Sequence, residues 1–367
     1  MSGGGNRYVQ YGLIGALVVI LGTAVIATAL DTSDGFSPGG NGNGGDGTPG
    51  GFPTEEPTTA EQTPDPTPEP TPEPTPTPTP TPVPLPDVLE GCHDERPAIE
   101  EGISLLPASE GSMFQGCQLV AFYGHPFSDQ MGELGVGDPA SMIGRLKAMA
   151  AEYEASNGGR QVVPTLHLIT SVAQRSAGPD GTYLARMEHE LIEEWIGYAE
   201  EHDLLILLDM QVGHGTIEDE FEHVADYLSN PRVHLAYDPE WAMAGTGQAP
   251  AAAVGHMTAE QINWIQHAFQ DVVDEYNLEN QMLMIHQFQD QMIRDKEQLE
   301  DLPGVDLVIH TDGFGTRHNK IEAYNRYVRD DDVQHSGFKL FFDWDVDLME
   351  PADVNRLDPQ PDVVTYQ

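Results

Sequence analysis

Lysine is scarce in this sequence, and basic residues as a whole are heavily outnumbered. Four of the 367 residues are lysine, and 16 Lys and Arg stand against 60 Asp and Glu, which gives a formal net charge of −44. A chain this acidic repels phosphate backbones and anionic lipid surfaces, which excludes nucleic acid as a partner. The composition is typical of a solvated acidic surface adapted to salt, because salt screens the repulsion among like charges. A cation-binding surface is the alternative interpretation.

Cysteine is rarer still, and the chain has only Cys92 and Cys117. In an exported chain this pair is predicted to form one disulfide, which closes a loop of about 25 residues. The disulfide would join the start of the folded domain to its first strand, and the chain-entropy model assigns it about 3 kcal/mol of stabilisation. A pair of metal ligands is the alternative.

Charge is absent from residues 11–30, which are rich in Leu, Ile, Val and Ala. Twenty such residues span a bilayer as a helix. Because Arg7 precedes them, the positive-inside rule places residues 1–10 in the cytoplasm and the rest of the chain outside. A cleaved signal peptide ending near Ala27-Thr-Ala29 is the alternative. The sequence thus predicts a single-pass cell-membrane protein with an extracellular C-terminal domain, or a secreted protein if the segment is cleaved.

Residues 31–86 have the composition of a disordered linker. Glycine and asparagine make up residues 39–45, and proline alternates with Thr or Glu through much of residues 64–86. The first stretch is typical of a flexible coil, and the second is typical of extended polyproline II structure. Neither can bury an apolar core, so this segment is predicted to be a spacer between the membrane and the following domain.

Residues 87–367 have ordinary globular composition and are predicted to form one domain. Eight short apolar runs have the pattern of parallel strands buried on both faces. These runs are residues 119–123, 162–169, 204–209, 233–237, 282–286, 306–310, 339–342 and 363–366. Helical patterns lie between most of them. They run from Asp138 up to Asn157, over residues 186–202, from Thr216 up to Pro231, from Thr258 through Val273, and over residues 290–302, 320–329 and 351–357.

This alternation predicts a (β/α)8 barrel of the TIM type. A doubly wound open sheet is the alternative, but no glycine-rich phosphate loop follows an early strand: residues 123–126 read Tyr-Gly-His-Pro. Because the sequence ends directly after the eighth strand, we expect the last helix to be missing. The segment of residues 88–116, held by the cysteine pair, is predicted to cover the gap.

Polar side chains follow nearly every predicted strand. In a (β/α)8 barrel the C-terminal ends of the strands form the working face. The candidates in chain order are His125, His167, Asp209, Gln211, Asp238, Glu240, Trp241, His286, Gln287, His310, Asp312, Asp343, Trp344, Asp345 and Tyr366. A single histidine there is commonly a rim residue, and a single aspartate is commonly a helix cap. Their convergence on one mouth favours a functional cleft, because burying so many unpaired polar groups would be costly.

Glycoside hydrolysis is the first chemistry that these residues suggest. It needs two carboxyl groups, of which one has a raised pKa and acts as the acid. Glu240 is the candidate acid, Asp238 would orient it or keep it protonated, and Asp343 or Asp345 would be the partner across the mouth. Trp241 and Trp344 would stack on sugar rings, and further substrate contacts are predicted. These are His125, Asp209, Gln211, His286, Gln287, Asp312 and Tyr366.

The D-x-E of Asp238 and Glu240 at the tip of strand 4 resembles that of chitinase-like and lysozyme-like glycosidase barrels. The placement of carboxylates on strands 4 and 7 resembles the large clan of retaining (β/α)8 glycosidases. The resemblance implies hydrolysis of a polysaccharide or cell-wall glycan without a cofactor. The complete D-x-x-D-x-D-x-E of chitinases is absent, Pro239 stands where the retaining clan has Asn, and strand 7 offers Asp instead of Glu. Retention or inversion therefore stays open.

Metal-assisted hydrolysis is the second chemistry. Histidine and carboxylate side chains at these strand ends suit Zn²⁺ or Mn²⁺. The candidate ligands are His125, His167, His286, His310 and Asp312, with Asp209 and Glu240 beside them. Histidines on strands 5 and 6 resemble the amidohydrolase barrels, but strand 1 has no H-x-H, strand 4 no Lys and strand 8 no Asp. A non-catalytic glycan-binding surface domain is the third possibility. In each case we expect a monomer.

Overall fold

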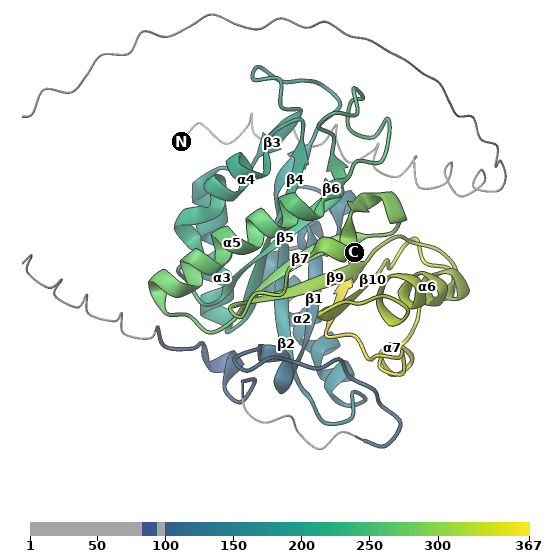
Figure 1. Ribbon diagram of the computed structural model, residues 1–367. Helices are drawn as coiled ribbons and strands as arrows, with labels where there is room; N and C mark the ends of the chain where they lie inside the picture. Colours follow the sequence, from purple (N-terminus) through teal and green to yellow (C-terminus); the bar gives the residue numbers. More distant parts are fainter. Residues whose placement is uncertain (1–82, 94–99) are drawn as a thin grey trace, which may run out of the picture. The chain divides into compact units, whose positions relative to one another are not determined.

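The computed structural model describes residues 83–93 and 100–367 (Figure 1). The predicted cytoplasmic tail, the anchor at residues 11–30 and the linker up to residue 82 lie outside the described residues. Within the described part of the chain, no helix is both long and apolar enough to cross a membrane.

Eight parallel strands close into a barrel, as the sequence predicted. Each strand pairs with the next along the chain, and the last pairs with the first, with Leu119 opposite Val363. In chain order the strands are β1 (Cys117–Gly124), β2 (Gln161–Ala173), β4 (Leu205–Gly213), β5 (Val233–Ala242), β7 (Gln281–Gln287), β9 (Val305–Thr311), β10 (His335–Leu340) and β11 (Val363–Tyr366). All eight predicted strands are confirmed.

Three short strands lie outside the barrel. β3 (Leu184–Arg186) pairs antiparallel with the C-terminal end of β2, so the long second strand continues into a hairpin beyond the barrel. β6 (Met257–Thr258) and β8 (Ile293–Arg294) form a small parallel pair of their own. Both additions are attached to segments that follow barrel strands at their C-terminal ends, the end that carries the candidate site residues.

Helices connect most successive barrel strands. They are α2 (Pro139–Glu154), α3 (His189–His202), α4 (Ile217–Val224), α5 (Ala259–Tyr276), α6 (Arg317–Tyr324) and α7 (Pro351–Val354). Side-chain caps begin α2 and α5: Asp138 accepts a hydrogen bond from Ser141 N, and Thr258 and Gln261 form a reciprocal capping box. In Figure 1, α3, α4 and α5 lie on one side of the barrel, and α6 and α7 lie on the other.

Single helical turns complete the described structure. The 3-10 turns are η1 (Asp87–Leu89), η2 (Met113–Gln115), η3 (Asp129–Met131), η4 (Glu133–Gly135), η5 (Ala225–Tyr227), η6 (Asp290–Met292) and η7 (Lys296–Gln298), and η8 (Asn325–Arg329) is a π-helical turn. The predicted helix over residues 290–302 is wrong, because η6, the short strand β8 and η7 form there instead. Between them Asp295 adopts a left-handed backbone with φ of 55°, which a continuous helix cannot contain.

The segment before β1 plugs the floor of the barrel. Leu89, Met113 and Phe114 are buried among inward-facing strand residues, and the Cys92–Cys117 disulfide ties the segment to the first residue of β1. The disulfide prediction is confirmed. The expectation that this segment covers the outside of the barrel after the eighth strand is wrong for Leu89, Met113 and Phe114, whose side chains enter the barrel interior, and residues 94–99 lie outside the described residues.

Helices α2 and α7 lie beside β11 instead. The Tyr153 hydroxyl on α2 hydrogen-bonds the Tyr366 hydroxyl on β11 at 2.8 Å, and Asn355, just after α7, donates to Tyr153 O at 3.2 Å. Both tyrosines belong to the apolar core between the barrel and its helices. Helices α2 and α7 thus cover the outer face of β11.

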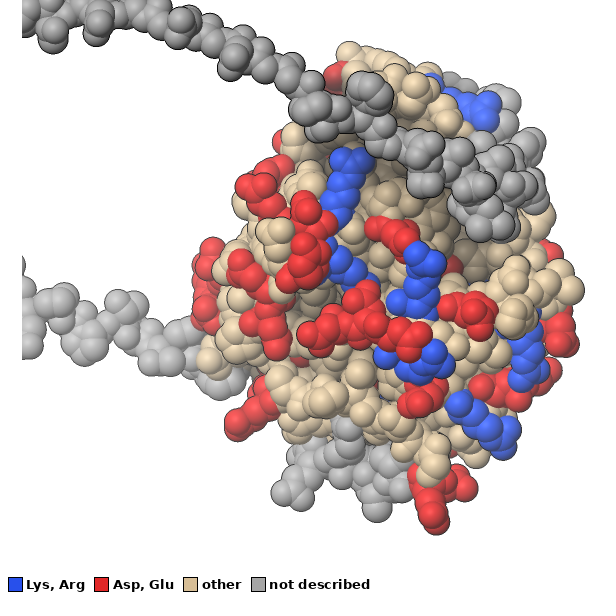
Figure 2. Space-filling view, turned by 45° about the vertical axis from the view of Figure 1, so that its right-hand side comes forward, with Lys and Arg blue, Asp and Glu red and all other residues tan. Residues whose placement is uncertain are grey.

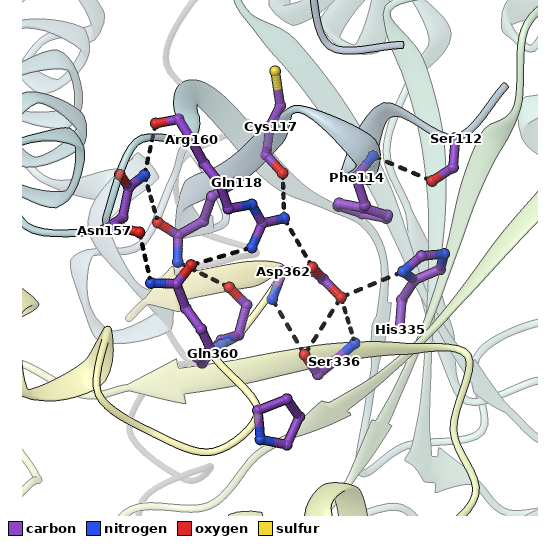
Figure 3. Close-up of polar contacts among 12 residues, drawn as sticks. Ser112, Phe114, Cys117, Gln118, Asn157, Arg160, His335, Ser336, Gln360 and Asp362 are labelled. Atoms are coloured by element: carbon purple, nitrogen blue, oxygen red, sulfur yellow. Dashed lines mark hydrogen bonds and ion pairs between the residues drawn. The ribbon is translucent and has the colours of Figure 1, made fainter. Parts of the chain in front are cut away.

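A buried ionic cluster also lies at the floor (Figure 3). The Arg160 guanidinium meets Asp362 Oδ1 at 2.8 Å, while Asp362 Oδ2 accepts from His335 Nδ1 at 3.3 Å and from Ser336 N at 3.2 Å. Ser112, from the plugging segment, donates to Asp306 Oδ2 at 2.7 Å. The plug is therefore fixed by polar contacts as well as by its apolar side chains.

Candidate functional site

One side chain from each of the eight strands enters a common layer near the C-terminal ends. Strand residues on either side of them, such as Leu208 beside Asp209 and Ile285 beside His286, pack outward against the helices. Because successive side chains of a strand point to opposite faces, Asp209, His286 and their equivalents on the other strands must face the barrel interior. The inward layer consists of Tyr123, His167, Asp209, Asp238, His286, His310, Lys339 and Thr365.

A continuous chain of ionic contacts crosses this layer. Asp209 Oδ2 lies 2.9 Å from His167 Nε2 and 3.1 Å from His286 Nε2. The other nitrogen of His286, Nδ1, lies 2.9 Å from Asp312 Oδ2, which also accepts from Lys339 Nζ at 3.0 Å. The chain therefore runs from β2 through β4 and β7 to the end of β9 and to β10.

The charges in this chain fix one another. Burial alone would lower the pKa of His286, but Asp209 and Asp312 outweigh it and raise that pKa to about 10. Burial would raise the pKa of Asp312, but Lys339 and His286 hold it well below its usual range. Burial lowers the pKa of His167 to about 4 against the opposing effect of Asp209, so that ring is neutral. Lys339 also lies 3.9 Å from the centroid of the Tyr123 ring.

Asp238 and Glu240 end β5 beside this chain. Asp238 is 3% exposed, and its Oδ1 accepts from Glu240 N at 3.0 Å. Burial raises the pKa of Asp238 to about 6, with Asp312 and Asp209 contributing and His286 opposing. Glu240 is half-buried, and burial together with the Asp238 and Asp312 carboxylates raises its pKa well above the usual value. The site thus holds two neighbouring carboxyls with raised pKa values, and solvent can reach that of Glu240.

The two carboxylates predicted from strand 7, Asp343 and Asp345, lie in the loop that follows it, and their role as partner of the acid stays a prediction. Strand β10 ends at Leu340, before both of them. Asp345 accepts from Gly315 N through Oδ1 and from Phe341 N through Oδ2, each at 2.9 Å, so it ties two loops together. Asp343 is exposed. The carboxylates that act most strongly on Glu240 are instead Asp238 and Asp312.

The two predicted stacking tryptophans differ in exposure. Trp241 is 6% exposed, whereas Trp344 is 43% exposed, and its ring centroid lies 6.0 Å from that of Phe314. Tyr366 is 1% exposed and faces α2, away from the inward layer. Only Trp344 among these three presents an open face.

Three further predicted residues are occupied by local contacts. His125 Nδ1 accepts from Phe127 N at 3.3 Å, and burial lowers the pKa of His125 to about 4. Gln211 Oε1 accepts from Ala173 N at 2.8 Å, which fixes the end of β2. A matching contact holds Gln287, whose Oε1 accepts from Lys296 Nζ at 2.9 Å. Their predicted roles in binding substrate stay predictions.

Lys339 and Tyr123 belong to the site but were missed as site residues. Lys339 was placed at the start of a strand over residues 339–342, whereas β10 begins at His335, so that Lys339 lies near its C-terminal end. Lys339 could have been found from the alternation of side chains along the strand, because His335, Gly337 and Lys339 are two residues apart and therefore share the inward face. Tyr123 could have been found by the same period in β1.

Two groups of three side chains could hold a metal ion within the described residues. One comprises His167, Asp209 and His286, and the other comprises Asp238, His286 and Asp312. Within each group the ligand atoms lie within 4.8 Å of one another. Of the ligands predicted from sequence, His167, His286 and Asp312 belong to these groups. His310 stacks edge-on to His286 at 4.9 Å between centroids, and His125 belongs to neither group.

Comparisons with known proteins add little to this description. No protein-family model matches the sequence, and no curated protein matches it. A solved structure, a GH5-4 broad specificity endoglucanase from an uncultured bacterium, matches 60% of this chain and 76% of its own, with 9% identity and a TM-score of 0.27. So weak a likeness carries no information about chemistry. The eight parallel strands that close into a barrel show the (β/α)8 fold that the sequence predicted.

Proposed function

We propose that this protein is a glycoside hydrolase that acts on a polysaccharide or cell-wall glycan outside the cytoplasm. The observation that carries the proposal is the environment of Glu240. Its carboxyl lies at the mouth of the barrel, accepts no hydrogen bond from the described residues, and has a pKa raised well above its usual value by burial and by Asp238. A protonated carboxyl in reach of solvent is what the departing glycosidic oxygen requires.

Glu240 donates its proton to the leaving oxygen, and Asp238 supports it. The backbone amide of Glu240 is bound to Asp238 Oδ1, which fixes the turn that carries the acid. Asp312 supplies the second carboxylate, which Lys339 and His286 keep ionised. Its negative charge stabilises the positive charge that develops on the sugar ring in the transition state. This assignment replaces Asp343 and Asp345 with Asp312 as the partner of the acid.

The proposed location rests on the sequence and on the disulfide. A buried Cys92–Cys117 bond agrees with folding in an oxidising compartment. Residues 11–30 would anchor the chain in the membrane, and residues 31–86 would hold the barrel away from it. Protease treatment of intact cells tests this location, because an external barrel must be released by cleavage in the linker.

Conversion of Glu240 to Gln tests the chemistry. The full-length protein would be assayed in high salt for release of reducing ends from a panel of polysaccharides and from peptidoglycan. We expect Glu240→Gln to lower kcat by about 100-fold or more, since general acids contribute that much. Glu260→Gln, in the exposed first turn of α5, is the matched control and should leave activity unchanged.

Two outcomes would overturn the proposal. Equal activity of Glu240→Gln and wild type would show that another group is the acid. A folded wild-type protein that binds a glycan of the panel without cleaving it would instead establish a non-catalytic binding domain.

A further inference from the structure

The centre of the inward layer has the geometry of a metal site. His167 on β2, Asp209 on β4 and His286 on β7 are each 0% exposed. Both Nε2 atoms converge on Asp209 Oδ2, at 2.9 and 3.1 Å. Ligand atoms around a tetrahedral Zn²⁺ are about 3.3 Å apart when each lies about 2.0 Å from the ion. We propose that these three side chains bind one divalent first-row transition-metal ion, of the class of Zn²⁺ or Mn²⁺.

An unsatisfied acceptor points independently to a missing ligand. Asp209 Oδ1 is buried and has no hydrogen-bond partner among the described residues. Leaving a buried carboxylate oxygen without a partner costs free energy, and such atoms are rare in folded proteins. His310 Nδ1 is buried and without a partner in the same part of the chain, and its ring lies 4.9 Å from that of His286. An ion that bound Asp209 through both oxygens would satisfy Oδ1 as well as Oδ2.

The surroundings of His286 match those of a metal ligand. When one imidazole nitrogen binds a metal, the other usually donates to a carboxylate that fixes the ring orientation. His286 Nε2 faces Asp209, and its Nδ1 lies 2.9 Å from Asp312 Oδ2. Asp312 is itself held by Lys339 Nζ at 3.0 Å and by Gly313 N at 2.5 Å. The second shell of the proposed site is therefore already built.

Formal charge is compatible with a divalent cation. Without an ion, a charged His286 offsets part of the negative charge, whereas a metal-binding His286 is neutral and leaves the carboxylates of Asp209, Asp238 and Asp312 against the single ammonium of Lys339. Uncompensated buried charge is strongly destabilising. A divalent ion balances the two negative charges that Lys339 leaves over. This inference does not depend on glycoside hydrolysis, because the ion would organise β2, β4 and β7 whatever reaction the mouth performs.

Metal content tests the site without reference to activity. The full-length protein would be stripped with a chelator, titrated with Zn²⁺, Mn²⁺ and Co²⁺, and analysed for metal per chain and for the visible absorption of bound Co²⁺. We expect about one ion per chain, and a Co²⁺ spectrum of low coordination number. Asp209→Asn and His286→Gln should abolish both signals.

Controls separate this site from adventitious binding. His267→Gln removes an exposed histidine that lies 2.7 Å from Glu300, a surface counterpart of the buried pairs, and should keep the full stoichiometry. If Asp209→Asn fails to fold, Asp312→Asn decides, since loss of a second-shell partner should weaken affinity about 10–100-fold. A folded wild type that binds no ion of the three would overturn the proposal. So would full stoichiometry in both His286→Gln and Asp312→Asn.

Discussion

Two clusters of buried charged groups occupy opposite ends of the barrel, and they differ in how completely their carboxylates are paired. At the floor, both oxygens of Asp362 and both oxygens of Asp306 accept hydrogen bonds. At the mouth, Asp209 keeps one oxygen without a partner among the described residues. The carboxyl of Glu240 accepts no hydrogen bond from the described residues either, and Glu240 is half-buried.

This difference indicates that the floor cluster stabilises the fold and that the mouth cluster carries the reactive groups. The floor cluster joins the plugging segment, β9, β10 and the residues before β11, and its paired charges hold these segments together. The mouth cluster leaves a buried oxygen of Asp209 and the half-buried carboxyl of Glu240 without hydrogen-bond partners among the described residues. (β/α)8 barrels in general keep reactive groups at the C-terminal ends of their strands and stability at the other end. Substitutions at the two ends should therefore change stability in opposite ways.

The largest expected effect is at the floor. Asp362→Ala leaves the buried charges of Arg160 and His335 without their shared partner. Breaking a buried ion pair on one side should lower the free energy of unfolding by about 3–5 kcal/mol. Chemical denaturation in high salt measures this. Asp290→Ala, which removes the exposed partner of Arg326, is the control and should change stability little. A small effect at Asp362 would mean that the floor cluster does not hold the fold.

The fold was largely predictable from the sequence because buried parallel strands are apolar throughout. Seven of the predicted runs lie within or nearly coincide with the observed strands. β10 was placed too late, since its first three residues, His335, Ser336 and Gly337, are not apolar. The position of the plugging segment could not be predicted. Hydrophobic periodicity and composition indicate that a segment is buried, but they do not indicate which end of the barrel it packs against.

The candidate site was predictable in composition but not in pairing. The acids and histidines at strand ends were recognised, and Asp238, Glu240 and His286 do meet at one mouth. The proposed partnership of Glu240 with Asp312 instead of Asp345 depends on where β10 ends and on how Asp345 binds two loops. Those are properties of packing, which the spacing of residues along one chain does not contain.

A smaller effect at the floor should depend on pH. Burial would lower the pKa of His335, but its contacts with Asp306 and Asp362 raise it to about 9. The unfolded value is about 6.5, so the proton on His335 contributes about 3 kcal/mol, fully present below about pH 6.5 and lost as pH rises through about 9. The difference in unfolding free energy between wild type and His335→Gln should shrink between those limits. A difference independent of pH would show that His335 does not carry that proton.

The smallest expected effect has the opposite sign and lies at the mouth. The pKa of Glu240 is raised in the folded state, so folding favours the protonated acid, and stability is lost as pH rises above the unfolded value of about 4.3. Gln cannot ionise and has nearly the same shape. Glu240→Gln should therefore be at least as stable as wild type near that value and increasingly more stable as pH rises. The same denaturation series measures it. A destabilised Glu240→Gln would place Glu240 with the floor residues as a group that holds the fold, and the loss of activity in that variant would no longer identify an acid.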